Sequence, residues 1–160
     1  MTRSLSMTPL TIPDAIRAAM YDHALAAFPA ECCGYLTGPA PGDTVDTAVA
    51  CRNAQPDGDN PIAPERGNDT GFVIAGAELL AFARSFDTAQ PARVVYHSHT
   101  NGRAYFSDVD RAMADGPTYP VQHIVIGVAS GFAGSLVTEV AQFAWSDAER
   151  TYVEIARWEP

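Results

Sequence analysis

Two histidines and an aspartate at fixed spacing are the residues of this chain best placed for chemistry. His97 and His99 follow the apolar run 94–96, and residues two apart in a strand project from the same face, so both imidazoles can reach one point. A short loop with an Asn-Gly turn signal then leads to Ser107 and Asp110, three apart at the expected start of a helix. Two imidazoles and one carboxylate are a three-ligand zinc set that leaves a fourth position for water.

Each half of this pattern also has a purely structural interpretation. His-x-His alone is common at polar strand ends, and Ser-x-x-Asp alone is typical of a helix N-cap with an acidic first turn. The complete spacing in a strand–loop–helix context is more specific and predicts a catalytic Zn²⁺ site. Such a site needs a group that moves protons, and Glu31, before an apolar strand, is a candidate. Spacing alone leaves a solvated charge at a strand end as an equal alternative for Glu31.

The bulk properties fit one globular domain over residues 1–160, with 47% hydrophobic residues. A net charge of −9 disfavours binding to nucleic acid or to an anionic membrane surface. No signal peptide or membrane span is expected, because no apolar run has the required length. The three cysteines are therefore expected to be free thiols in a cytoplasmic protein. The open alternative is a disulfide that joins Cys51 to either Cys32 or Cys33.

Strands alternate with helices along the chain, which predicts an α/β (α+β mixed) fold with a mixed sheet flanked by helices. Helices are expected over 13–28, 75–86 and 107–114, and strands over 32–37, 45–51, 93–96, 121–128, 134–140, 142–145 and 152–156. The polar loop 53–70 has the length of a functional or mobile loop. Tyr105, Phe106 and His123 are interpreted as packing residues.

The segment 31–38, followed by His97-Ser98-His99, Ser107 and Asp110, resembles the JAMM (MPN+) metalloprotease family. The resemblance extends from the first helix to about residue 140 and implies a single-domain MPN fold with a curved mixed sheet that is cytidine-deaminase-like. It implies that His97, His99 and Asp110 are zinc ligands. It also implies that Glu31 is the general acid and base, and that Ser107 donates its hydroxyl to the polarised carbonyl oxygen.

Within this family the chain is most similar to small bacterial members, and Thr100 stands where many deubiquitinating members carry proline. The small members process ubiquitin-like sulfur-carrier proteins that end in Gly-Gly. They release a short extension, such as a cysteine, for thiocarboxylate-based sulfur transfer in cysteine or secondary-metabolite biosynthesis. Position beside the expected zinc site makes Cys33, Gly34, Thr100 and Arg103 candidate substrate contacts, with Arg103 suited to a carboxylate.

Other functions stay open at this point. The chain could remove a ubiquitin-like modifier from proteins, as desampylases and deubiquitinases do, or act as a non-catalytic MPN binding module. A zinc deaminase is disfavoured, because the chain lacks the His-x-Glu and Pro-Cys-x-x-Cys signatures of that class. Monomer and homodimer are both compatible with the sequence.

Overall fold

Six strands form one mixed sheet in the computed structural model, which describes residues 6–58, 60–115 and 118–160. Residues 1–5 of the N-terminus and residue 59 of the 53–70 loop lie outside these ranges. The strands are β1 (Cys33–Thr37), β2 (Thr47–Cys51), β3 (Ala92–His99), β4 (Gln122–Gly131), β5 (Gly134–Ser146) and β6 (Thr151–Trp158). Their order is β2-β1-β3-β4-β5-β6, in which β3 and β4 are parallel and the other neighbours are antiparallel. The predicted mixed sheet is confirmed.

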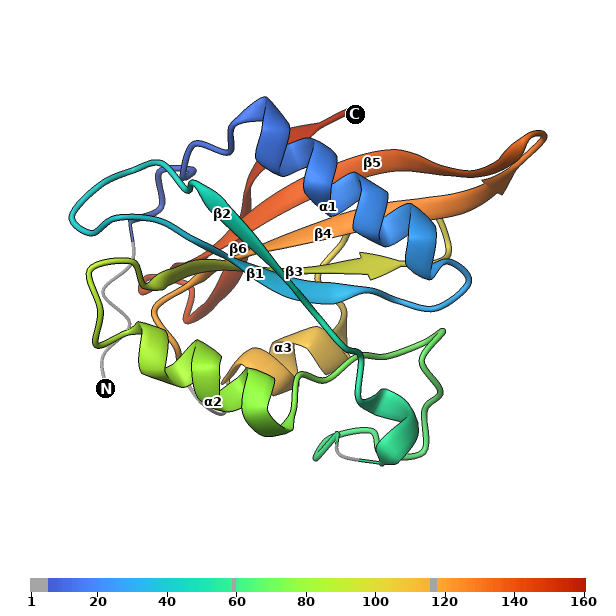
Figure 1. The fold of residues 1–160 in the computed structure, drawn as a ribbon, viewed down its shortest axis with the longest axis horizontal. Helices are drawn as coiled ribbons and strands as arrows, with labels where there is room; N and C mark the ends of the chain where they lie inside the picture. Colours follow the sequence, from blue (N-terminus) through green and yellow to red (C-terminus); the bar gives the residue numbers. More distant parts are fainter. Residues whose placement is uncertain (1–5, 59, 116–117) are drawn as a thin grey trace.

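Helices cover both faces of this sheet (Figure 1). Helix α1 (Asp14–Ala27) crosses one face, while α2 (Gly76–Ser85) and α3 (Asp108–Asp115) lie against the other. Pro13 precedes α1, where its fixed φ favours a helix start. A short 3-10 helix, η1 (Gln55–Asp57), lies in the segment between β2 and α2. None of the described helices is long and apolar enough to cross a membrane.

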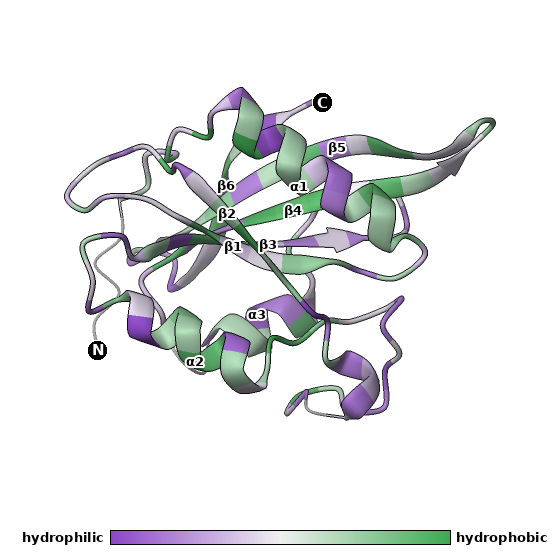
Figure 2. Ribbon diagram, in the orientation of Figure 1, coloured by the Kyte–Doolittle hydropathy of each residue, from purple (hydrophilic) through white to green (hydrophobic). Residues whose placement is uncertain are grey.

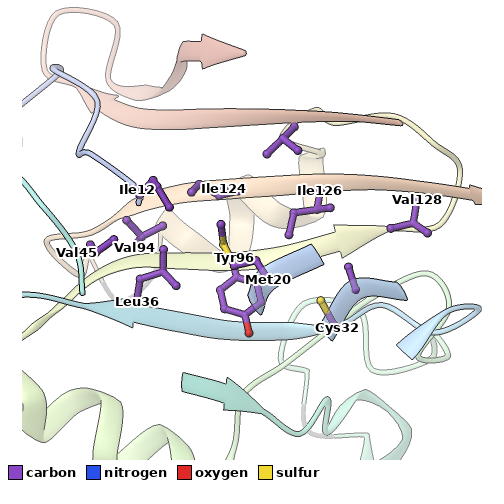
Figure 3. Close-up of a cluster of buried hydrophobic side chains, with 12 residues drawn as sticks. Ile12, Met20, Cys32, Leu36, Val45, Val94, Tyr96, Ile124, Ile126 and Val128 are labelled. Carbon is purple, nitrogen blue, oxygen red and sulfur yellow. The ribbon is translucent and has the colours of Figure 1, made fainter. Parts of the chain in front are cut away.

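The main core lies between α1 and the central strands, where hydropathic colouring is green through the middle of the sheet (Figure 2). Met20 and Ala24 of α1 are fully buried. They belong to the same cluster as Tyr96 of β3 and Ile124 of β4 (Figure 3). A second cluster, which includes Phe82 of α2, fills the opposite face. Since both faces are covered, apolar side chains of the central strands are buried on both sides of the sheet.

The structure has one continuous strand, β5, where the sequence predicts two strands separated at residue 141. The prediction is wrong because the polar Gln142 interrupts the apolar run but not the pairing of β5 with β4, while the register with β6 only shifts after Gln142. Its side chain is buried and donates from Nε2 to Gln122 Oε1 at 2.7 Å, which satisfies the amide inside the core. The neighbouring Ala141 pairs with Val125 of β4 and with Arg157 of β6.

Candidate metal centre

His97, His99 and Asp110 converge on one point beside the parallel β3–β4 pair. The two histidines lie two residues apart at the end of β3, so both project toward the face that α3 covers. His97 Nε2 lies 3.1 Å from His99 Nε2 and 3.1 Å from Asp110 Oδ2. His99 Nε2 lies 3.2 Å from Asp110 Oδ2. All three side chains are buried and together form a group that could hold a metal ion.

The separations of these three atoms fit a tetrahedral zinc ion. Zinc held about 2.0–2.1 Å from each ligand places the ligand atoms about 3.3 Å apart. The observed spread of 3.1 to 3.2 Å is close to that value. Three ligands from the chain leave the fourth position for water or substrate, and His99 and Asp110 both line an open cleft. The residues present therefore fit the ion that the sequence predicts.

The hydrogen bond of His99 supports the same conclusion. Its Nδ1 lies 3.2 Å from the carbonyl oxygen of Arg103, and a carbonyl only accepts, so in the neutral form of the ring, which is the form that binds metals, Nδ1 carries the proton. The lone pair of His99 Nε2 then faces Asp110 Oδ2, which is also an acceptor. Two acceptors at this distance repel unless a cation lies between them. On the other histidine, Phe72 stacks on the His97 ring, with centroids 4.3 Å apart.

Ser107 and Asp110 form a reciprocal cap at the start of α3. Asp110 N donates to Ser107 Oγ at 3.1 Å, and Ser107 N donates to Asp110 Oδ2 at 3.0 Å. The N-cap interpretation of this pair and the metal interpretation are thus both satisfied by one geometry. The cap orients the carboxylate toward the histidines, and it leaves the Ser107 hydroxyl proton free to donate elsewhere.

The register between β1 and β3 brings Glu31 next to the histidines, although Glu31 is far from them in the sequence. Cys33 pairs with His97 in the antiparallel β1–β3 ladder, and continuing that register places Glu31 opposite His99. Ser98 extends the alignment, because Cys32 N donates to Ser98 Oγ at 2.7 Å and Ser98 N donates to Cys32 O at 3.1 Å. Glu31 is 6% exposed and lines the same cleft as His99. The alternative of a solvated strand-end charge is therefore excluded.

The charge states match those of a metal site. Burial lowers the pKa of His97, so its ring is neutral. Burial alone would raise the pKa of Asp110, but the contacts with His97 and His99 hold it well below its usual range. Neutral imidazole and ionised carboxylate are the forms that bind metals. Burial first, and then the nearby Asp110 carboxylate, raise the pKa of Glu31 to about 9. A cation at the triad would lower the pKa of Glu31, toward the neutral range that suits a general base.

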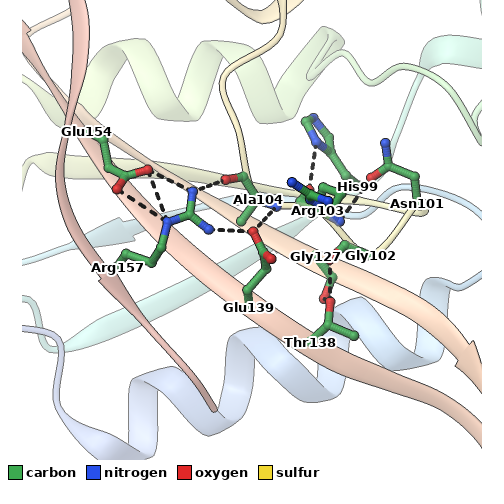
Figure 4. A network of polar contacts seen from close by, with 10 residues as sticks. All are labelled: His99, Asn101, Gly102, Arg103, Ala104, Gly127, Thr138, Glu139, Glu154 and Arg157. Carbon is green, nitrogen blue, oxygen red and sulfur yellow. Dashed lines mark hydrogen bonds and ion pairs between the residues drawn. The ribbon is translucent and has the colours of Figure 1, made fainter.

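A pair of charged side chains from β5 and β6 holds the loop 100–107, which joins the histidines to Asp110 (Figure 4). Ala104 N donates to Glu139 Oε2 at 3.0 Å, and Arg157 Nη2 donates to Ala104 O at 2.6 Å. Glu139 and Arg157 also form an ion pair with each other, and Arg157 pairs further with Glu154. Ala104 is therefore fixed through both its N–H and its carbonyl.

The preceding loop residues are fixed as well. Gly102 has a φ of 77°, in the left-handed region that favours glycine, and its N–H donates to Val128 O at 3.0 Å. Its carbonyl accepts from Thr138 Oγ1. Arg103 lies between Gly102 and Ala104, so these contacts set where its carbonyl meets His99 Nδ1. Sequence analysis did not identify Glu139 or Arg157, because nothing in their local sequence marks a contact with a loop more than 30 residues away.

Buried amides shape the segment 53–73 into a wall of the site. Asn53 Nδ2 donates to Glu31 O and to Gly71 O, both at 3.0 Å. Gln55 and Asn60 are each 1% exposed and bond to one another at 2.8 Å. In the described residues of the long polar loop predicted at 53–70, buried side-chain amides thus hold the backbone in place, and the asparagines and glutamine of this loop are the sequence feature that indicates it.

The cleft beside the triad has a volume of about 170 Å³. It is lined by Glu31, Arg66, Asp69, Thr70, Gly71, Phe72, His99, Thr100, Asn101, Tyr105, Ser107, Val109, Asp110 and Met113. Of the predicted substrate contacts, Thr100 is present, and its Oγ1 donates to Asp69 O at 2.9 Å. Tyr105 packs edge-on against His99, as a packing residue would, but it is 46% exposed and lines the cleft, so this contact lies at the surface and not in the core. Phe106 and His123 are buried, as predicted.

The structure does not bring Cys33, Gly34 or the Arg103 side chain into this cleft. Cys33 is fully buried under the segment that follows β2. Gly34 faces α1, on the opposite side of the sheet from the triad, and an added Cβ would collide with the Tyr96 hydroxyl. Arg103 lines a separate hollow with Glu139. Gly34 leaves the site because successive strand residues alternate between faces. Cys33 shares the face of Glu31 but is covered by the segment that follows β2, and Arg103 turns toward β5 and β6.

A mixed α/β domain that gathers His-x-His, an aspartate and a buried glutamate has the architecture of a JAMM-type metal centre. The family of prokaryotic homologues of the JAB domain matches this chain over residues 13–145. The chain belongs to this family, which confirms the resemblance seen in its sequence.

Named relatives point to the small bacterial members. The CysO-cysteine peptidases of Mycobacterium bovis and Mycobacterium tuberculosis are 32% identical over 108 residues, which cover 68% of this chain. The match spans 65% of the length of each of those relatives. Solution structures of proteins from Desulfitobacterium hafniense and Salinibacter ruber share the fold, each with a TM-score of 0.56. The first is 19% identical and covers 89% of this chain and 87% of its own, and the second is 18% identical and covers 94% and 91%.

Proposed function

We propose that this chain is a zinc-dependent peptidase acting on a ubiquitin-like sulfur-carrier protein. It hydrolyses the bond after the C-terminal Gly-Gly of that carrier and releases a small C-terminal extension. The observation that carries the proposal is the triad of His97, His99 and Asp110, with the buried Glu31 in the same narrow cleft. The likeness to CysO-cysteine peptidases supports the carrier as the substrate class.

The ion would polarise the scissile carbonyl and lower the pKa of a bound water. Glu31 lines the same cleft and takes the proton from the attacking water. As the carbon–nitrogen bond breaks, Glu31 returns that proton to the leaving amine. Ser107 donates its hydroxyl proton to the carbonyl oxygen, whose negative charge grows during attack. The net change is addition of one water, which gives a carboxylate on the carrier and a free amine.

The size of the cleft favours glycine before the cut. A cleft of about 170 Å³ beside the triad leaves little room for large side chains next to the scissile bond. The aromatic rings of Phe72 and Tyr105 line the cleft, where Phe72 stacks on His97 and Tyr105 packs against His99. A Gly-Gly tail passes these rings because it carries no side chains.

Mass spectrometry of a defined cleavage tests the proposal. Zinc-loaded protein is incubated with a sulfur-carrier protein extended past Gly-Gly by one cysteine, and the carrier is weighed. We expect loss of the cysteine mass, inhibition by a chelator, and inhibition when a bulky residue replaces the last glycine.

Two results would contradict the proposal. One is an extended carrier that stays intact with zinc-loaded enzyme, which would favour a non-catalytic module. The other is efficient release of a ubiquitin-like modifier from a lysine side chain without action on the extended carrier, which would favour a desampylase or deubiquitinase-like activity.

A further inference from the structure

Arg66 is the one arginine or lysine among the described residues that line the cleft, which it shares with the carboxylates of Glu31, Asp69 and Asp110. We propose that Arg66 binds the free α-carboxylate of the released C-terminal residue and so restricts the enzyme to extensions of one residue. This inference rests on the proposed peptidase function. It assigns to Arg66 the carboxylate contact that the sequence suggests for Arg103.

Arg66 is held for this task by its backbone, which leaves the side chain available. Its carbonyl accepts from Gln55 Nε2 at 3.0 Å, and its N–H donates to Ala63 O at 3.2 Å. Gln55 is buried, so this bond anchors the main chain of Arg66 beside the cleft while its side chain stays exposed. The guanidinium uses Nη1 for one bond, to Thr70 O at 3.1 Å. A guanidinium has five N–H donors in a planar fork, so an edge that matches a carboxylate remains.

If Glu31 protonates the new amine and Arg66 binds the carboxylate of the same amino acid, the two side chains must be neighbours. In a released α-amino acid, the new amine and the carboxylate are attached to the same carbon. The group that protonates the amine and the group that binds the carboxylate must therefore lie side by side. Arg66 and Glu31 line one small cleft, and the positive charge of Arg66 is felt at Glu31, whose pKa it lowers against the larger effect of burial.

Charge balance gives Arg66 a second reason to bind an anion. The chain carries a net charge of −9, and three carboxylates line the cleft. A substrate that ends in a carboxylate is repelled by such surroundings unless cations offset them. A zinc ion neutralises charge at the reacting carbonyl, while Arg66 does so where the C-terminus lies. A longer extension would carry its terminal carboxylate past this position and lose the contact.

A pair of matched substrates separates the role of Arg66 from the reaction itself. The carrier ends in Gly-Gly-Cys, either as the free acid or as the C-terminal amide, which keeps the shape but removes the charge. We compare wild type, Arg66→Gln, Arg66→Lys and the control Arg84→Gln, which removes the same charge from the exposed side of α2. Zinc content is measured for every protein by elemental analysis.

We expect wild type to favour the acid over the amide by about 10- to 100-fold in kcat/KM, the scale of one charge-assisted contact. Arg66→Gln should abolish this preference by slowing only the acid, mostly through KM, while Arg66→Lys restores part of it. Arg84→Gln should behave as wild type. Equal cleavage of acid and amide by wild type, or an equal loss on both substrates in Arg66→Gln with normal zinc, overturns the role of Arg66 and leaves the peptidase intact. Failure of wild type on both substrates overturns the proposed function and this inference with it.

Discussion

At the residue scale, the proposed metal binding and the proposed proton transfer belong to different side chains. His97, His99 and Asp110 are within 3.2 Å of one another at their ligand atoms, while Glu31 reaches the same cleft from a separate strand end. Variants of the two groups should therefore fail in different ways.

Glu31→Gln keeps the shape of the side chain and removes its capacity to accept a proton. We expect a normal zinc content and a fall in turnover of about 100-fold or more, the usual scale of general acid–base catalysis. Elemental analysis and single-turnover cleavage measure the two effects. His97→Ala is the matched contrast, since it should lose both zinc and turnover. Turnover near that of wild type in zinc-loaded Glu31→Gln would remove Glu31 from the mechanism.

The three cysteines, all free and buried, belong to packing in this interpretation. Burial, which is the largest cause, raises the pKa of Cys32 to about 11 and that of Cys51 to about 12, and it raises the pKa of Cys33 further. Thiols of the unfolded chain ionise near 9. Above that pH the unfolded state loses protons that the folded state keeps, so the thiols lower the free energy of unfolding as pH rises from about 9 to 11.

A Cys32→Ala, Cys33→Ala, Cys51→Ala protein tests this assignment. Urea unfolding should show a weaker fall in stability between pH 8.5 and about 10.5 than in wild type, because the ionising thiols are gone. The triple variant should still cleave the carrier at neutral pH. Identical pH dependence in the two proteins would mean that the native thiols are not protected, and loss of cleavage in a folded, zinc-loaded triple variant would assign them a catalytic role.

At the element scale, the loop 100–107 is the part that turns strand and helix into a metal site. Strands β5 and β6 are remote from the histidines in sequence, yet Glu139 and Arg157 fix Ala104, beside the carbonyl that orients His99. Mutation of the hydrogen-bond partners of metal ligands commonly lowers the affinity for the metal by about 10- to 100-fold.

Glu139→Ala should therefore weaken zinc binding by about 10-fold while leaving the fold in place. Competition with a chromogenic chelator measures the dissociation constant, and circular dichroism checks the fold. Glu154→Ala is the control, because Glu154 also pairs with Arg157 but, within the described part of the chain, forms no hydrogen bond with Ala104. An equal loss of zinc affinity in both variants would show that Glu139 acts through its charge and not through its hydrogen bond with Ala104.

At the scale of the whole molecule, the site joins segments that are far apart in the chain. Glu31, the histidines and Asp110 are gathered only when β1, β3 and α3 have assembled on one sheet. An ion that binds all three ligands binds the folded state alone and must stabilise it.

Zinc at a thousand times its dissociation constant should add about 4 kcal/mol to the free energy of unfolding, which for a chain of 160 residues raises Tm by roughly 10 °C. Calorimetry with and without a chelator measures this shift. The control is Asp110→Ala, whose Tm should be insensitive to zinc because one of three ligands is gone. An equal shift in Asp110→Ala would place the ion elsewhere on the molecule.

The sequence by itself determined the candidate ligand set and most of the elements. His-x-His on a strand and Ser-x-x-Asp at a helix start are local patterns whose period fixes the direction of each side chain. The apolar periodicity of α1 and of the central strands is local in the same sense, and these elements agree with their predicted ranges to within a few residues.

Only the tertiary structure decided which other residues share the site. Glu31 is a solvated charge or a buried acid depending on the β1–β3 register, which is a long-range property. Arg66 and Asp69 enter the cleft because buried amides fold the segment 53–73 over it, while Gly34 leaves the site because its face of the strand turns to α1. Register, loop closure and the pairing of distant charges depend on contacts between remote segments, and no local periodicity records them.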